Sequence, residues 1–137
     1  MIRYQTTTND IDRGMLLGYF NGWPAPPSPD THLAILNGSD HVVLAMEENP
    51  RRVVGFITTL SDGVSCAYIP HLEVITDRQD RGIGSELVRR LREALREIYM
   101  IDLLCDDDVI PFYEGLGFQR GGGMAIRNYQ NQSGVTG

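Results

Sequence analysis

The chain has 137 residues and a formal net charge of −6, with 42% hydrophobic and 22% charged residues. This length suits one domain with its own core, and the composition excludes a disordered chain, a collagen-like fibre and a coiled coil. An acidic chain is a poor free-standing nucleic-acid binder, because phosphate contacts need clustered basic residues. No apolar run approaches the roughly 18 residues of a membrane span, and the polar N-terminus lacks a signal-peptide core. We therefore expect a cytoplasmic protein that binds neither nucleic acid nor a membrane.

The types of reactive residue narrow the chemistry further. All twelve basic residues are arginine, which excludes lysine Schiff bases and lysine-dependent phosphate binding of the Walker type. The cysteines Cys66 and Cys105 make no metal-ligand spacing, and neither do His32 and His41. We expect no metal, and we expect both thiols to be reduced.

The first third of the chain predicts two helices separated by a stiff loop. Asn9 or Asp10 can cap a first helix that runs to about Phe20. Residues 22–29 contain four prolines, which forbid a helix there. A Ser-Pro start and an Asn-Gly stop then bound a second helix over residues 29–36.

The middle of the chain predicts a strand meander. Residues 41–46 and 53–60 are apolar enough to form two strands, and the Ser-Asp-Gly turn at 61–63 leads into a long strand over residues 64–75. Pro70 lies inside that strand and removes one backbone donor. We therefore expect a bulge or a free edge at Pro70.

The last part predicts a strong helix over residues 85–99, because its apolar residues recur on one helical face. A buried strand over 100–105, a short helix over 109–116 and one or two closing strands within 118–128 follow. Residues 129–137 are interpreted as a flexible tail. Residues 1–128 then form a single α/β domain with a mixed sheet.

The connection from the long strand to the strong helix is a candidate phosphate site. Gly82 and Gly84 let the backbone approach a ligand closely. The amides at the helix start have no partners within the helix, and the helix dipole favours an anion there. Two glycines alone often serve packing, and neither a Walker loop nor a dinucleotide fingerprint is present.

Two segments resemble signatures of the GCN5-related N-acetyltransferase (GNAT) superfamily. The first is Gln79-x-x-Gly82-x-Gly84, between a strand and an amphipathic helix, and the second is the FYExxGF-like run from Pro111 to Phe118. Their order and spacing fit that superfamily. Other segments are similar to plastid and bacterial members related to serotonin (arylalkylamine) N-acetyltransferases: Phe20-x-Gly22-Trp23-Pro24, Ser61-Asp62-Gly63, and the short step from Cys105 to Phe112-Tyr113.

The resemblance implies a mixed, bent sheet with helices on both faces and acetyl-CoA as cosubstrate. The strands that flank the strong helix would splay apart to admit the pantetheine arm, whose amides would pair with the backbone of Leu72, Glu73 and Val74. Gln79 would lie at the lip of a pyrophosphate cradle. That cradle would be made by the amides of Asp80, Arg81, Gly82, Ile83, Gly84 and Ser85.

The chemistry of acetyl transfer needs a neutral amine, although an amine with a pKa near ~10.4 is almost fully protonated at pH 7. A general base or a desolvating pocket must therefore act. His71 is the first candidate for the base, by proton relay through water, and Glu73 is the second. Either one could instead be an ordinary strand residue. By resemblance, Tyr113 is the general acid for the leaving thiolate, and the alternative is a tyrosine that only packs the short helix.

The acceptor is a primary amine that the sequence leaves unidentified. Phe20 and Trp23 could form an apolar wall, which favours a small arylalkyl or cationic amine, or they could simply plug the sheet. Asp106, Asp107 and Asp108 form either an acidic lip or a solvated turn whose last residue caps a helix. We expect direct attack in a ternary complex. The alternatives are a protein N-terminal or lysine acetyltransferase, a non-catalytic acyl-CoA sensor and an unrelated nucleotide-binding domain; a homodimer is a further expectation.

Overall fold

A computed structural model describes residues 1–134 and contains one six-stranded mixed sheet. The strands run in the order β1-β2-β3-β4-β6, and β5 also pairs with β3. All pairs are antiparallel except the parallel pair β4–β6. The strands are β1 Arg3–Gln5, β2 His41–Glu47, β3 Arg52–Ser61, β4 Cys66–Tyr68, β5 Leu72–Val74 and β6 Met100–Asp102.

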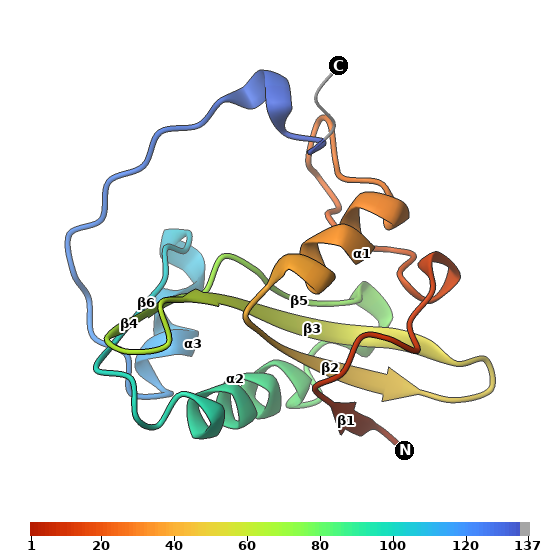
Figure 1. The fold of residues 1–137 in the computed structure, drawn as a ribbon, viewed down its shortest axis with the longest axis horizontal. Coiled ribbons are helices and arrows are strands. Elements are labelled where there is room, and N and C mark those ends of the chain that lie inside the picture. Colours follow the sequence, from red (N-terminus) through yellow and green to blue (C-terminus); the bar gives the residue numbers. More distant parts are fainter. Residues whose placement is uncertain (135–137) are drawn as a thin grey trace.

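Helices cover both faces of this sheet. Helix α1 (Pro29–Gly38) packs on one face, α2 (Ile83–Ala94) lies along the other, and the short α3 (Ile110–Glu114) lies beyond the β4–β6 end (Figure 1). The Ser28 hydroxyl caps α1 by accepting the Thr31 amide at 3.1 Å, as the Ser-Pro start predicts. The predicted α/β fold, with helices on both faces of a mixed sheet, is confirmed.

Strand β3 forms the centre of the core because its side chains alternate between the two helical layers. Phe56 is fully buried and contacts His32 of α1, with ring centroids 4.4 Å apart. On the other face, a Cβ on Gly55 would lie 3.1 Å from Ile83 and 3.2 Å from Leu87, so the missing side chain allows α2 to approach closely. The sheet is therefore pressed between the two helices at β3.

The predicted first helix is wrong. Only the 3-10 turn Arg13–Met15 forms in that region, and the chain then turns through positive φ angles at Gly18 (93°) and Phe20 (60°). Such angles break a right-handed helix, while burial of the apolar side chains still anchors the segment. A second difference is β1, a short edge strand that the mostly polar N-terminus did not reveal.

The predicted long strand is divided at Pro70, as the proline suggested. Strand β4 pairs with the end of β3 and with β6, whereas β5 pairs with Gly55–Ile57 of β3 and not with β6. The two strands that flank α2, β5 and β6, therefore splay apart, which the GNAT resemblance implied.

The C-terminal part departs most from expectation. Helix α2 ends at Ala94, and β6 is exposed rather than buried, with Met100 42% exposed. The predicted short helix is present as a 3-10 turn followed by α3. No closing strand forms within residues 118–128, because this glycine-rich segment lies away from the sheet. The segment predicted to be a tail contains the 3-10 turn Tyr129–Asn131, and residues 135–137 lie outside the described part.

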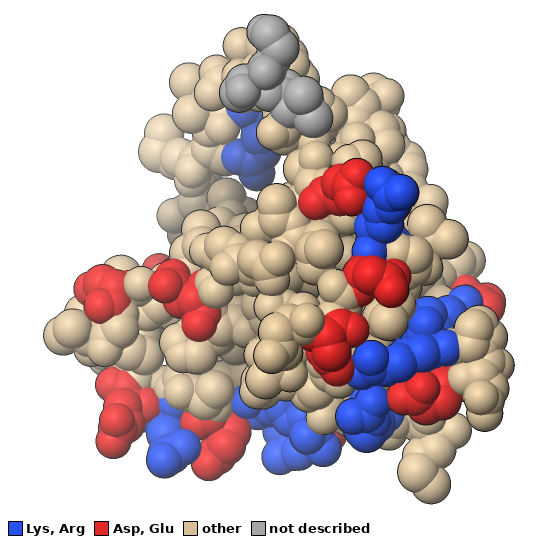
Figure 2. All heavy atoms as spheres, turned by 45° about the vertical axis from the view of Figure 1, so that its right-hand side comes forward, with Lys and Arg blue, Asp and Glu red and all other residues tan. Residues whose placement is uncertain are grey.

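Charges of both signs are interleaved on the surface. The face shown in Figure 2 has blue and red side chains side by side and no continuous basic patch. Typical exposed pairs are Arg3–Glu48 at 3.0 Å and Arg13–Asp30 at 3.2 Å. Within residues 1–134, no helix is long and apolar enough to cross a membrane.

Candidate acetyl-CoA and amine site

A cavity of about 720 Å³ opens where β5 and β6 splay apart. Its walls come from β5, from the start of α2, from the segment after β6 and from α3. All but one of the residues predicted to bind the cofactor line it, and the exception is Arg81. The lining residues are Ile69, Pro70, Leu72, Glu73, Val74, Arg78, Gln79, Asp80, Gly82, Ile83, Gly84, Ser85, Leu104, Cys105, Asp106, Val109, Phe112 and Tyr113.

The start of α2 presents free backbone donors to this cavity. Gly82 is the N-cap residue in the left-handed conformation, with φ 79°, and no side chain caps the helix. No amide from Asp80 to Ser85 donates to any atom of residues 1–134. Unpaired amides at a helix N-terminus favour an anion, so this cradle fits the pyrophosphate of a CoA thioester.

Gly84 keeps this cradle open. A Cβ at Gly84 would lie 3.5 Å from the Phe112 ring and 3.9 Å from Val74, in ordinary contact with both walls. A longer side chain would therefore project into the cavity. The spacing of Gly82 and Gly84 is by itself weak evidence for a ligand site. In the structure it corresponds to an open helix start that an anion can approach.

The free edge of β5 presents a second set of unpaired backbone groups to the cavity. The His71 carbonyl accepts from Thr58 N, and the Ile75 amide donates to Val54, so these alternate residues face β3. Leu72 and Val74 therefore turn their amides and carbonyls toward the cavity. The Gln79 side chain donates to the Val74 carbonyl at 3.0 Å, and the Leu72 and Val74 amides have no partner within residues 1–134. These groups fit the amides of an extended pantetheine arm.

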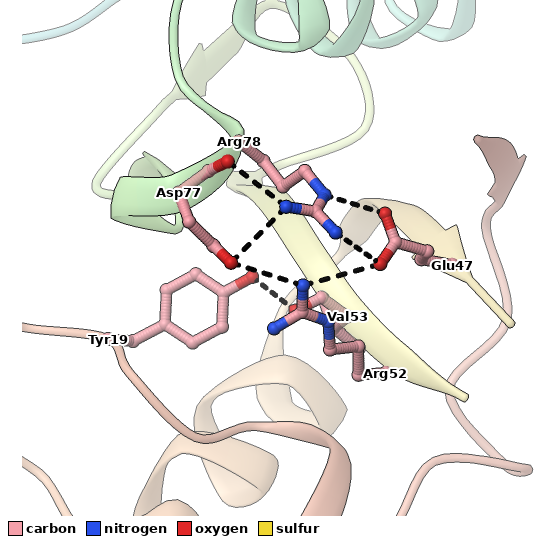
Figure 3. Close-up of polar contacts among 6 residues, drawn as sticks. All are labelled: Tyr19, Glu47, Arg52, Val53, Asp77 and Arg78. Atoms are coloured by element: carbon pink, nitrogen blue, oxygen red, sulfur yellow. Dashed lines mark hydrogen bonds and ion pairs between the residues drawn. The ribbon is translucent and has the colours of Figure 1, made fainter. Parts of the chain in front are cut away.

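An ion-pair network fixes the start of the cradle loop to the sheet (Figure 3). Arg78, which lines the cavity, donates to Glu47 at the end of β2 at 2.7 and 2.9 Å, and Arg52 joins Glu47 to Asp77. Hydrogen bonds from Arg78 lower the pKa of Glu47 to about 2. No local sequence pattern predicts this network, because Glu47 and Arg78 are 31 residues apart.

Tyr113 lies across the cavity from the β5 edge. Its ring packs against Phe112 and Phe118, with centroids 5.0 and 5.6 Å away. Burial, with a smaller effect from Cys105, raises the pKa of Tyr113 to about 12. The hydroxyl is therefore protonated at neutral pH and can donate into the cavity.

His71 and Glu73 project from β5 toward α1, on the same face as Phe56. Burial lowers the pKa of His71, so its imidazole is neutral and can accept a proton at neutral pH. Burial raises the pKa of Glu73, and the hydrogen bond from the Phe20 amide partly opposes this rise. That amide lies 3.0 and 3.1 Å from the two carboxylate oxygens of Glu73. Glu73 is thus not a surface carboxylate, since it ties β5 to the Phe20–Trp23 loop.

An aromatic cluster surrounds His71, although His71 does not line the main cavity. Phe20 lies 5.8 Å from the His71 ring and Trp23 lies 6.3 Å from it. Phe20 is buried, whereas Trp23 remains 39% exposed at the rim. Phe20 therefore packs in the core, as the alternative of a plug over the sheet expects, and Trp23 alone of this pair keeps a face open to solvent.

Sequence reasoning missed His32, which α1 places beneath this wall. It is 1% exposed, and burial lowers its pKa to about 4, so it is neutral. Neither ring nitrogen has a partner within residues 1–134. A helical histidine at this spacing carries no signal in the sequence, because only the packing of α1 on Phe56 buries it.

The three consecutive aspartates do not cap a helix. Asp106 occupies the N-cap of the 3-10 turn Asp107–Val109 without a side-chain bond, and Val109, not Asp108, precedes α3. Asp106 lines the cavity beside Cys105. Within residues 1–134, no three His, Cys, Asp or Glu side chains are arranged to hold a metal.

The chain matches the model of the acetyltransferase (GNAT) family over residues 9–118. It is 32% identical over 100 residues to the uncharacterized N-acetyltransferase ycf52 of Pyropia yezoensis, which covers 71% of this chain and 58% of that protein. GCN5-related N-acetyltransferase 2, chloroplastic, of Arabidopsis thaliana is 33% identical over 75 residues, or 53% of this chain and 29% of that protein. The chain therefore belongs to the GNAT family of N-acetyltransferases, whose cosubstrate is acetyl-CoA, and its relatives include plastid-type members.

The fold matches over almost the whole chain. A solved structure from Deinococcus radiodurans R1, assigned as an acetyltransferase, superposes with a TM-score of 0.95 at 46% identity and covers 99% of this chain and 94% of that one. By contrast, the chain spans only a little over half the length (58%) of the ycf52 relative.

Proposed function

We propose that this chain transfers an acetyl group from acetyl-CoA to a primary amine by direct attack within a ternary complex. The observation that carries the proposal is one cavity that joins three groups: unpaired amides at the start of α2, the free edge of β5 and the protonated hydroxyl of Tyr113. The amides would hold the pyrophosphate, and the Val74 amide would stabilise the negative carbonyl oxygen. Tyr113 would protonate the departing thiolate.

Direct attack is supported by the state of the nearest thiol. Cys105 lines the cavity, but burial and the neighbouring aspartates raise its pKa. A thiol that is protonated at neutral pH is a weak nucleophile, so an acetyl-cysteine intermediate is disfavoured. Cys105→Ser should therefore retain turnover.

The proton of the incoming amine would leave through His71. The imidazole is neutral and lies on the α1 face of β5, where a water can connect it to an amine at the gap. Glu73 acts in this scheme as a positioning residue, because its carboxylate holds the Phe20 amide.

The acceptor would be a small arylalkyl or cationic amine. Trp23, backed by the buried Phe20, offers an aromatic face, which attracts both an apolar ring and an ammonium group. Acidic residues lie near by: Asp106 lines the cavity, and the Glu73 carboxylate lies beside the Phe20 amide. A cytoplasmic location stays a prediction, and the Arabidopsis relative is named chloroplastic.

Calorimetric titration with acetyl-CoA, using NAD as the control, tests whether the chain binds the proposed cosubstrate. Micromolar binding of acetyl-CoA alone is expected, and preference for NAD would overturn the proposal. Turnover is then compared across arylalkyl amines, polyamines, lysine peptides and peptides with free N-termini. Fastest turnover of small amines is expected. Preference for peptides would indicate a protein acetyltransferase, and tight binding with no accelerated CoA release would indicate an acyl-CoA sensor.

A further inference from the structure

A group of buried polar atoms on the α1 side of the sheet has no hydrogen-bond partner within residues 1–134. It consists of both ring nitrogens of His32 and the hydroxyl oxygen of Thr58. His32 is 1% exposed and Thr58 is 0% exposed. Buried polar side chains normally bond to the protein or to ordered water, because leaving one unpaired is unfavourable. These atoms therefore mark a place where water can bind inside the fold.

Thr58 lies directly opposite His71. The Thr58 amide donates to the His71 carbonyl at 3.1 Å, one residue beyond the ladder that joins β3 to β5. Opposite residues of an antiparallel pair turn their side chains to the same face, with Cβ atoms roughly 5 Å apart. Thr58 and Phe56 are two residues apart on β3, so both face α1. The unpartnered hydroxyl is therefore a neighbour of the His71 ring.

His32 approaches the same place from α1. The Phe20 ring centroid lies 5.0 Å from that of His32 and 5.8 Å from that of His71. Phe56 likewise lies 4.4 Å from His32 and 6.3 Å from His71. The two imidazoles thus belong to one cluster of rings. Burial lowers the pKa of His32 to about 4, so its ring is neutral and one nitrogen can accept a hydrogen bond.

The other titratable side chains packed around Phe56 already have partners. They are Glu73 and Tyr19. The Glu73 carboxylate accepts a backbone amide at 3.0 and 3.1 Å, and the Tyr19 hydroxyl donates to a backbone carbonyl at 2.7 Å. Tyr68 lies farther along this face, at the exposed end formed by β4. Within residues 1–134, the groups beside His71 that remain wholly unpaired are therefore the hydroxyl and the imidazole described above.

We propose that Thr58 and His32, acting through an ordered water, form the proton-accepting partner of His71 in acetyl transfer. This inference rests on the proposed function, in which His71 takes the proton that leaves the amine. A buried imidazolium is costly unless its N–H groups find acceptors. A water that contacts His71, Thr58 and His32 has three polar partners, within the two to four that a buried water needs.

The proton balance assigns each group a role. As the amine nitrogen bonds to the acetyl carbon it loses one proton, which one ring nitrogen of His71 gains. The N–H on the other nitrogen donates to the water, and the water donates to the Thr58 hydroxyl and to a His32 nitrogen. The proton returns from His71 to solvent when the product leaves. Thr58 and His32 touch no reacting atom, so they are positioning residues that orient the His71 ring and stabilise its protonated form.

NMR titration of the histidine rings tests this partnership without any turnover. The chain has three histidines, so single variants assign each signal. Thr58→Val keeps the shape of the side chain and removes the hydroxyl, so the proton affinity of His71 should fall about tenfold, seen as a lower pKa. Thr58→Ser keeps the hydroxyl and should titrate like the wild type. Thr59→Val is the matched control, because it removes an equally buried and unpartnered hydroxyl from the opposite face of β3. An unchanged pKa of His71 in Thr58→Val would overturn the proposal.

His32→Leu tests the other side of the water. It should also lower the pKa of His71, and its combination with Thr58→Val should add little, because both residues hold the same water. Fully additive effects would contradict a shared partner. If His32→Leu does not fold, the comparison of Thr58→Val with Thr58→Ser and Thr59→Val decides alone.

Kinetics separate this inference from the proposed function. In Thr58→Val the acidic limb of the rate should move to lower pH, and kcat should fall several-fold because a weaker base removes the proton more slowly. Acceptor KM and acetyl-CoA affinity should stay the same. A lower kcat with an unmoved limb would reveal a packing role and refute the inference while the proposed function stands. A shifted pKa of His71 in a protein that acetylates no amine would support the partnership and refute only the proposed function.

Discussion

The two faces of β5 are built from different kinds of group. On the α2 face, the candidate cofactor cradle consists mainly of backbone: free amides from Asp80 to Ser85 and the outward edge of Leu72 and Val74. On the α1 face, the candidate acceptor side consists of side chains that are far apart in sequence, such as Trp23 and His71, which pack on the buried Phe20. A shared cosubstrate can be held by backbone groups common to many sequences, whereas acceptor choice needs side chains that differ between proteins.

The largest expected effect comes from blocking the candidate cofactor cradle, which consists mainly of backbone groups. Gly84→Glu places a carboxylate in the cradle, where it competes with the pyrophosphate, so acetyl-CoA affinity should fall by about 100-fold or more, equivalent to ~2.7 kcal/mol. Calorimetry measures this loss. Ala94→Glu adds the same charge at the far end of α2 and should bind normally. Unchanged affinity in Gly84→Glu would place the pyrophosphate elsewhere.

The next effect separates catalysis from binding at the cavity. Tyr113→Phe removes the protonated hydroxyl and should lower kcat by roughly 100-fold, the lower end of the range for general acid catalysis, because a thiolate is a tolerable leaving group. Acetyl-CoA affinity should stay the same, since the ring is kept. Tyr129→Phe, at an exposed tyrosine, is the control. Wild-type turnover between pH 6 and 9 would remove Tyr113 from the mechanism.

The pH dependence of the rate tests the role of His71 on the α1 face of β5. His71 accepts a proton only when neutral, and its pKa lies below the ordinary value near ~6.5 because it is buried. The rate should therefore fall as pH drops through that lowered pKa. His71→Gln should lose this acidic limb and about 100-fold in kcat, the lower end of the range for general base catalysis. A limb that persists in His71→Gln belongs to another group.

Glu73 offers a smaller and more selective change. Glu73→Ala releases the Phe20 amide, so the loop that carries Phe20 and Trp23 loses its tie to β5. The acceptor KM should rise by about 10-fold, the lower end of the worth of one charged hydrogen bond. Acetyl-CoA affinity and kcat should change little. Glu73→Gln keeps an acceptor oxygen and should restore most of the KM. If kcat collapses in both variants, Glu73 takes part in proton transfer.

The smallest effect concerns the anchor of the cradle loop. The pKa of Glu47 is lowered to about 2, so its stabilising contribution is present above the ordinary value near ~4.3 and is lost as pH falls toward 2. Glu47→Gln should lower the free energy of unfolding by about 1 kcal/mol at pH 7, a value limited by partial exposure. Urea unfolding at pH 7 and pH 3 should show a smaller difference at the lower pH. An equal difference at both pH values would exclude the carboxylate charge as the cause.

The segment after α3 shows where prediction from the sequence fails. Residues 118–128 contain apolar residues at a strand-like spacing, which predicts a closing strand. A strand also needs a partner edge at the right place, and within residues 1–134 the chain beyond α3 makes no backbone hydrogen bond to β6. The same limit explains the first predicted helix: its apolar residues are buried, but through a turn with positive φ angles rather than a helix.

The sequence by itself determined the features that depend on neighbouring residues. These include the Ser28 cap of α1, the amphipathic α2, the break at Pro70 and the glycine turn that leaves amides free at Gly82 and Gly84. Such features follow from backbone sterics and helix periodicity over a few residues, and the two motifs were enough to suggest the family.

Only the tertiary structure decided which distant side chains meet. The tie between Glu73 and the Phe20 amide spans 53 positions, and the Glu47–Arg78 pair spans 31. His32 is neutral because α1 packs it against Phe56, which no local pattern reveals. Burial and pairing are properties of the packed chain, and for this reason the acceptor side of the site emerges only from the fold.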